Sequence, residues 1–60
     1  MVEIGSLIED RWGDLFRVLT VDDQEIWMEK IRPKPSEGVF HTRHVKWADF
    51  ERFGYRLVFP

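Results

Sequence analysis

Hydrophobic and polar residues alternate along much of this 60-residue chain, most clearly between Leu15 and Val21. Phe16, Val18 and Thr20 fall on one side of an extended chain and the residues between them on the other, because successive strand side chains point to opposite faces. Apolar residues occur on both sides, which is typical of a central strand shared by two packed layers. This segment is therefore predicted to be the central strand of a sheet.

Four further extended segments are expected around this strand, separated by turn-forming residues. Gly13 marks a turn before it, Asp22–Gln24 a hairpin turn after it, and two prolines make residues 32–38 a loop. The four segments cover residues 4–11, 25–31, 39–45 and 55–59.

A single helical turn is expected over residues 46–53, between the last two strands. Phe50 and Phe53 stand three positions apart, the spacing at which two side chains share one face of a helical turn, so both rings are predicted to point inward. Gly54 is expected to end the turn. The predicted core consists of Leu7, Phe16, Val18, Ile26, Met28, Val45, Phe50, Phe53 and Val58.

Five short strands with tight turns favour a small barrel, which leaves few strand edges exposed. Three segments carry a resemblance to a known architecture: Phe16-Arg17-Val18-Leu19, Ile26-Trp27-Met28-Glu29, and Val45 to Phe53 with Asp49 and Phe50 between. In these segments the chain resembles the SH3-like small β-barrels, which implies an all-β fold: one five-stranded barrel with a short helical turn, formed by residues 1–60 as a single domain. KOW-type and Tudor-type modules share this resemblance, as do short bacterial and phage-encoded proteins. The KOW glycines and a Tudor aromatic cage are missing, so no family's binding residues are carried over.

Composition agrees with an all-β domain near the lower size limit for independent folding. Val and Ile together number ten against a single Ala, and β-branched and aromatic residues suit a pleated surface. Nine aromatic residues, three of them Trp, offset the short length by burying a large area each. The chain has no Cys, no apolar run of membrane-spanning length and no secretory signal at its N-terminus, so we expect a cytoplasmic protein.

Residue patterns for catalysis, metal binding or cofactor binding are sparse. Ser6 and Ser36 lie outside any nucleophile-elbow context. His41 and His44 are three apart, and in a strand they would face opposite sides, so no metal site is expected. The four glycines are isolated and form no phosphate-binding loop. These observations predict a non-catalytic binding module without metal or cofactor.

Charge is distributed unevenly. Residues 1–28 hold seven acidic and two basic residues, whereas residues 29–60 hold four acidic and seven basic, for a formal net charge of −2. In the second half basic residues interleave with aromatics, a pattern that suits nucleic acid because Lys and Arg neutralise phosphates and exposed rings stack on bases. The first hypothesis is therefore a nucleic-acid-associated accessory or regulatory factor. Its predicted nucleic-acid-binding residues are Lys30, Arg32, Lys34, Arg43, Lys46 and Trp47. The alternative is a solvated strand face with Trp47 in the core.

A second hypothesis is a protein–protein interaction module, such as an adaptor or a small inhibitor encoded by a phage or mobile element. Trp12 lies at an expected turn, where a large ring can anchor a partner, and acidic neighbours would favour a basic protein. The predicted protein-binding residues are Trp12, Trp27, Asp10 and Asp14. The alternative is that Trp12 folds back as a lid on the barrel. A third hypothesis is a homo-oligomer, such as a homodimer, in which exposed aromatics serve assembly.

Overall fold

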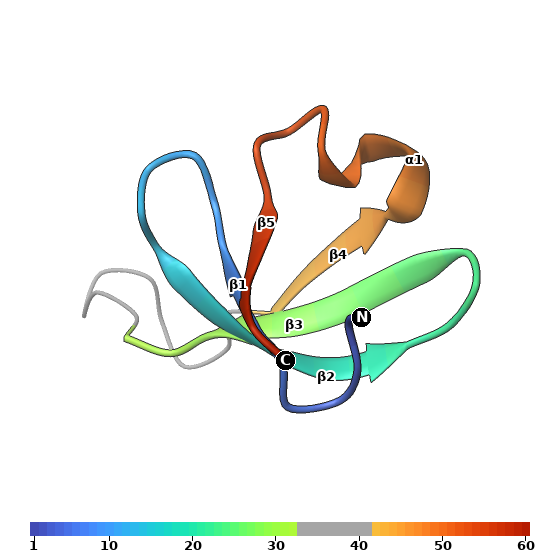
Figure 1. Ribbon diagram of the computed structural model, residues 1–60, viewed down its shortest axis with the longest axis horizontal. Helices are drawn as coiled ribbons and strands as arrows, with labels where there is room; N and C mark the ends of the chain where they lie inside the picture. Colours follow the sequence, from blue (N-terminus) through green and yellow to red (C-terminus); the bar gives the residue numbers. More distant parts are fainter. Residues whose placement is uncertain (33–41) are drawn as a thin grey trace.

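The computed structural model describes residues 1–32 and 42–60, which form a five-stranded antiparallel sheet with one short helical turn (Figure 1). The hydrogen-bonded order is β4-β3-β2-β1-β5, so β4 and β5 are the edge strands, and no ladder joins them in the described part of the chain. The elements are β1 (Leu7–Glu9), β2 (Leu15–Val21), β3 (Glu25–Lys30), β4 (Thr42–Lys46), α1 (Trp47–Phe50) and β5 (Arg56–Phe59).

The predicted strands match the observed ones best in the middle of the sheet. β2 has the predicted bounds, and β3 ends one residue earlier than expected. β1 is much shorter than residues 4–11, because Gly5 adopts a positive φ of 90° and Asp10 already begins the next turn. The proline loop and the start of the predicted fourth strand, residues 33–41, lie outside the residues that the structure describes.

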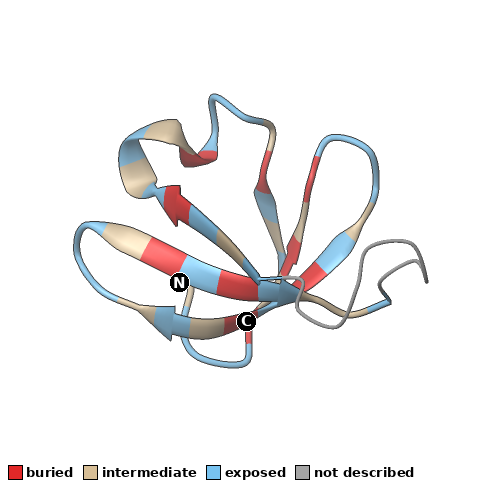
Figure 2. Cartoon of the chain, turned by 180° about the vertical axis from the view of Figure 1, so that it is seen from behind, coloured by how far each residue is buried: buried red, intermediate tan, exposed pale blue. Residues whose placement is uncertain are grey.

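The inward face of the sheet carries a compact apolar core (Figure 2). Register partners Ile8 and Phe16 both point inward, as do Val18 and Met28. An irregularity between Val18 and Thr20 shifts the register and turns Thr20 outward, which corrects the predicted alternation of β2. The buried cluster consists of Ile8, Phe16, Val18, Ile26, Met28, Val45, Phe50 and Tyr55.

Three predicted core residues are not buried: Phe53 and Val58 are each 46% exposed, and Leu7 is half-buried. The hydrogen bonds after α1 explain Phe53. Tyr55 N–H donates to Phe50 C=O (3.1 Å) and Gly54 N–H to Glu51 C=O (2.9 Å), the Schellman pattern in which a left-handed glycine reverses the chain. The reversal places Tyr55, not Phe53, against Phe50, with ring centroids 5.6 Å apart.

Leu7 and Val58 owe their exposure to the way in which β5 pairs with β1. The register shifts between Leu7 and Ile8, so Leu57 rather than Val58 pairs with the buried Ile8. Leu57 packs against the core in consequence, and Phe59 pairs with Leu7 on the outer side. The irregularity at Val58 therefore places Leu57 against the core and leaves Val58 exposed.

The hairpin turn between β2 and β3 needs no glycine, because none of its residues has a positive φ, and the Asp22 side chain stabilises it. Its carboxylate accepts the backbone N–H groups of Gln24 (2.8 Å) and Glu25 (2.9 Å). These bonds favour the charged form of the carboxyl, so they hold the pKa of Asp22 below its usual 3.8. The bond from Gln24 has the larger effect.

Replacing Asp22 by alanine is therefore expected to lower the stability of the fold at neutral pH. A carboxyl whose pKa is lowered by folding contributes stability that is present above its unfolded-state pKa and is lost as the pH falls through its folded-state pKa. The difference in urea midpoint between the native protein and D22A should thus shrink as the pH falls below 3.8. The matched control is Asp23→Ala, next in the same turn; a difference that grows in acid would contradict the prediction.

Candidate functional site

Two of the predicted basic residues, Lys30 and Arg43, are engaged within the fold. The Lys30 side chain is only 10% exposed, and its Nζ lies 3.6 Å from Asp14 Oδ2. The Arg43 guanidinium lies 4.6 Å from the centre of the Phe16 ring, and its Nη1 donates to the Tyr55 hydroxyl (2.9 Å). Both side chains therefore help to hold strands together.

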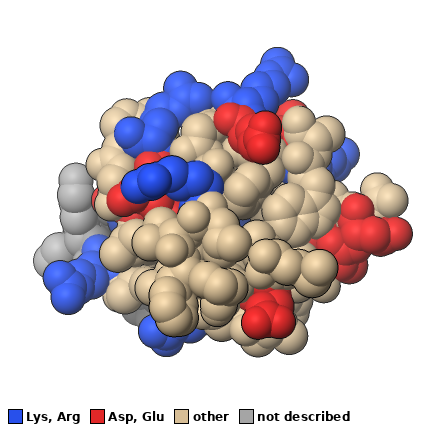
Figure 3. Space-filling model, in the orientation of Figure 1, with Lys and Arg blue, Asp and Glu red and all other residues tan. Residues whose placement is uncertain are grey.

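The other predicted basic residues do not gather on one face. Lys46 pairs in register with Glu25 at the start of β3, whereas Arg32 follows the other end of that strand. The two ends of β3 lie about 17 Å apart at roughly 3.3 Å per residue. Lys34 lies outside the described residues. Figure 3 shows blue basic side chains spread over several parts of the visible face, with red acidic ones among them.

Trp47 is held by the fold. Its indole Nε1–H donates to the Asp22 carbonyl (2.7 Å), and its ring packs on Phe50 at 5.1 Å. Because its N–H group is hydrogen-bonded and its ring already packs on Phe50, this indole is poorly placed to stack on a nucleic-acid base. The contacts agree with the alternative reading, in which Trp47 belongs to the edge of the core.

Trp27 and Trp12 were predicted to form one protein-binding surface, but they lie near opposite ends of β2. Trp27 pairs in register with Thr20 near the end of that strand, and Trp12 precedes its first residue. The Trp27 ring is stacked on His44 at 4.4 Å between centroids, and His44 is also ion-paired with Glu25. One side of the Trp27 ring is thus already covered.

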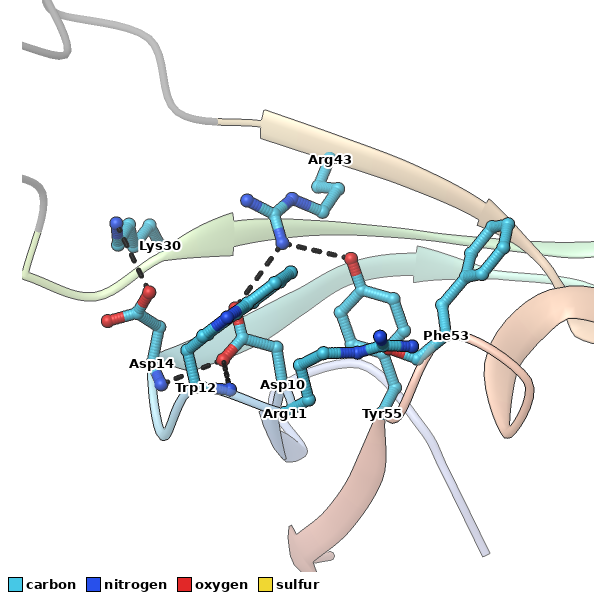
Figure 4. A network of polar contacts seen from close by, with 8 residues as sticks. All are labelled: Asp10, Arg11, Trp12, Asp14, Lys30, Arg43, Phe53 and Tyr55. Atoms are coloured by element: carbon cyan, nitrogen blue, oxygen red, sulfur yellow. Dashed lines mark hydrogen bonds and ion pairs between the residues drawn. The ribbon is translucent and has the colours of Figure 1, made fainter.

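Trp12 is 75% exposed at the tip of the β1–β2 loop, so it does not fold back as a lid. The loop beneath it is fixed by Asp10, whose side chain is only 2% exposed. Asp10 Oδ1 accepts the backbone N–H groups of Trp12 (3.0 Å) and Asp14 (2.9 Å), and Gly13 N–H donates to the Asp10 carbonyl (3.1 Å) (Figure 4). The ring is therefore exposed on a well-defined backbone.

Arg11 ties this loop to the turn after α1. Its Nε donates to the Phe53 carbonyl (3.1 Å) and its Nη2 to the Arg52 carbonyl (3.3 Å), while its guanidinium lies 5.5 Å from the Trp12 ring centre. Gly54 lies so close that an added Cβ would stand 2.8 Å from Arg11 Cβ. The partly exposed Phe53 is thereby brought to the same side of the molecule as the loop. We call the set Arg11, Trp12, Arg43 and Phe53 the Trp12 surface.

The acidic residues predicted to frame Trp12 each have a partner within the fold, although the Asp14 side chain is still 42% exposed. Asp10 is buried and bonded to the loop backbone, and Asp14 is paired with Lys30. Glu9, the third acidic neighbour, accepts a hydrogen bond from Arg56 Nε (2.7 Å) on the other edge of β1. Among the described residues, the Arg11 guanidinium lies by the Trp12 ring, and the Arg43 guanidinium faces Asp10, which binds the Trp12 backbone.

Sequence reasoning did not single out Arg11 or Phe53 for this surface. Nothing local in the sequence indicates that Arg11 reaches the carbonyls of residues 52 and 53, some forty positions away. Gly54 was the available signal, since a glycine that ends a helical turn permits a close approach by another segment. Which segment approaches is decided only by the fold.

Comparison with protein-family models, curated proteins and solved structures gives no match to this chain. Within the described ranges there is no group of three or more His, Asp or Glu side chains placed to hold a metal ion. None of the helical residues described forms a segment long and apolar enough to cross a membrane.

Proposed function

We propose that this chain is a small non-catalytic protein-interaction module that binds a partner protein through the Trp12 surface. The observation that carries the proposal is a largely exposed Trp12 on a loop held by a buried carboxylate. The strand order, and a helical turn between β4 and β5, support an SH3-like barrel as the finer description of its fold.

The energetics of an exposed tryptophan favour this function. A Trp side chain buries about 150–250 Å², and at about 25 cal/mol per Å² its full burial is worth about 4–6 kcal/mol. Most of that stabilisation is unused in the free protein, because three quarters of Trp12 is exposed. A ring on an ordered loop also loses little conformational entropy on binding, which is why interface hot spots are often rigid aromatics.

Nucleic-acid binding has less support. Of its predicted residues, Lys30, Arg43 and Trp47 are engaged within the fold, and the exposed Arg32 and Lys46 lie at opposite ends of β3. Phosphate binding depends on several cations acting together. The chain as a whole is also acidic, with a net charge of −2.

The test is a selection of random phage-displayed peptides on the immobilised full chain, followed by calorimetry on the selected peptides. Trp12→Ala should weaken binding by about tenfold or more, the effect of losing a hot-spot aromatic. The matched control is Trp27→Ala, a partly exposed tryptophan on the same chain, which should change the affinity by less than about threefold.

Nuclear magnetic resonance of the three indole N–H groups gives a second readout. The Trp12 resonance should shift on adding a selected peptide, whereas that of Trp47, bonded to the Asp22 carbonyl, should stay in place and report an intact fold. Peptides that bind equally well to W12A, or a selection that returns no binder, would overturn the proposal.

A further inference from the structure

We propose that the Trp12 surface takes an acidic peptide segment, with a carboxylate of the segment on Arg43 and a neighbouring apolar side chain on Trp12. The inference rests on the proposed function and names the chemistry of the partner. The charge of this partner is opposite to that expected from the sequence, which favoured a basic protein.

Two nitrogens of the Arg43 guanidinium are not used in hydrogen bonds to the described residues. Its Nη1 faces the Tyr55 hydroxyl (2.9 Å) and Asp10 Oδ2 (3.5 Å), and Figure 4 shows the other two guanidinium nitrogens turned away from them. In the described part of the chain, Nε and Nη2 have no hydrogen-bond partner. Two adjacent N–H groups on a planar fork match the two oxygens of a carboxylate.

The guanidinium is also held in place before a ligand arrives. It lies over the Phe16 ring at 4.6 Å, its Nη1 is fixed by Tyr55, and its side chain is still 40% exposed. A partner carboxylate would therefore meet a donor pair that is already oriented, which reduces the conformational entropy lost on binding.

Positive charge exceeds negative charge immediately around Trp12. Arg11 donates to backbone carbonyls and has no carboxylate partner among the described residues, so its charge is not compensated. Among the described residues, Asp10 is the one carboxylate paired with Arg43, and its Oδ1 is already bonded to two amides. Lys30 and Asp14 pair with each other. In this part of the described structure, the positive charges of Arg11 and Arg43 are opposed only by the buried Asp10 carboxylate.

Trp12 and Arg43 are neighbours through this same carboxylate. Asp10 Oδ1 binds the Trp12 backbone N–H at 3.0 Å, while Asp10 Oδ2 faces Arg43 Nη1 at 3.5 Å. An extended segment can therefore reach both with residues close together in its sequence. A nucleic acid fits less well, because two arginines beside an apolar ring neutralise few phosphates and the net charge of −2 repels a long polyanion.

The peptides selected on the full chain test this inference separately from the proposed function. Binders that depend on Trp12 should be enriched in Asp or Glu next to an apolar residue. Replacing that acidic residue by its amide in a synthetic peptide should weaken binding by about tenfold or more without touching the protein. Trp12-dependent binders that are neutral or basic would overturn the inference and leave the proposed function standing.

A protein variant gives the second arm. Arg43→Lys keeps the charge but removes the forked donor pair, and should weaken the acidic peptide by about fivefold or more. The matched control is Arg17→Lys, on the outer face of β2 opposite Glu29, which should leave the affinity unchanged. Far-ultraviolet circular dichroism and the Trp47 indole resonance check that each variant is folded.

A labelled single-stranded oligonucleotide, titrated at about 50 and 200 mM salt, gives the third arm. It should bind more weakly than the acidic peptide at both salt concentrations. Tighter binding of the oligonucleotide, lost in R43K and W12A, would assign the surface to phosphate and overturn the inference.

Discussion

Replacing Asp10 by alanine is expected to lower the free energy of unfolding by about 3 kcal/mol, because it removes a buried carboxylate and leaves two part-buried backbone donors and Arg43 without this acceptor. The Asp10 side chain is 2% exposed and accepts two backbone N–H groups of its own loop. Arg43 would keep its hydrogen bond to Tyr55 but lose the Asp10 carboxylate that faces its Nη1. The loop that carries Trp12 would lose its internal support at the same time.

Urea unfolding followed by circular dichroism measures this loss directly. The matched control is Asp14→Ala, a half-exposed carboxylate of the same loop paired with Lys30, for which about 1 kcal/mol or less is expected. Asp10→Asn should fall between the two, since its amide oxygen still accepts a hydrogen bond but carries no charge. Equal losses for D10A and D14A would show that burial of the Asp10 carboxylate does not determine the stability of the loop.

The middle of the sheet could be predicted from sequence because its pattern is local. Alternation of apolar residues defines β2, and the apolar residues Ile26 and Met28 define the inward face of β3. The ends of the sheet could not be predicted in this way. The irregularity at Val58 and the reversal at Gly54 each change which apolar residue faces inward. Both depend on backbone geometry that cannot be predicted from the neighbouring residue types.

The charge asymmetry along the chain has a structural explanation that the sequence alone did not give. The acidic first half and the basic second half meet across the sheet, in pairs that join distant segments. The pairs are Asp10 with Arg43, Asp14 with Lys30, Glu9 with Arg56, and Glu25 with His44. Two residues of the predicted basic face, Lys30 and Arg43, are therefore used within the fold.

The exposure of Trp12 was within reach of sequence reasoning, because Gly13 and Asp14 mark a turn. The chemistry around Trp12 was not, because it depends on Arg43, which is brought in from β4 more than thirty positions away. Asp10, two positions before Trp12, binds the loop backbone, and its second carboxylate oxygen faces the distant Arg43.

Replacing Gly54 by alanine is expected to lower the free energy of unfolding by about 3 kcal/mol, through backbone strain and a steric overlap together. Gly54 has a φ of +84°, which costs an L-residue about 1–2 kcal/mol. The added Cβ would also stand 2.8 Å from Arg11 Cβ and 3.6 Å from Arg11 Cα. These atoms are part of or next to the backbone, so the overlap is relieved only if the β1–β2 loop and the turn after α1 move apart.

Alanine variants of Gly5 and Gly13 distinguish backbone strain from steric overlap. Their φ values are 90° and 85°, close to that of Gly54, but an added Cβ at either position meets nothing within 4 Å. Gly5→Ala and Gly13→Ala should therefore show the backbone strain alone, about 1 kcal/mol each after the lower entropy of the unfolded chain is counted. The excess loss in G54A measures the contact that joins Arg11 to the turn, and the same variant should weaken peptide binding at the Trp12 surface. If all three variants lose the same free energy, the two loops are not held together by this contact, and the fixed position of Trp12 must depend on Asp10 alone.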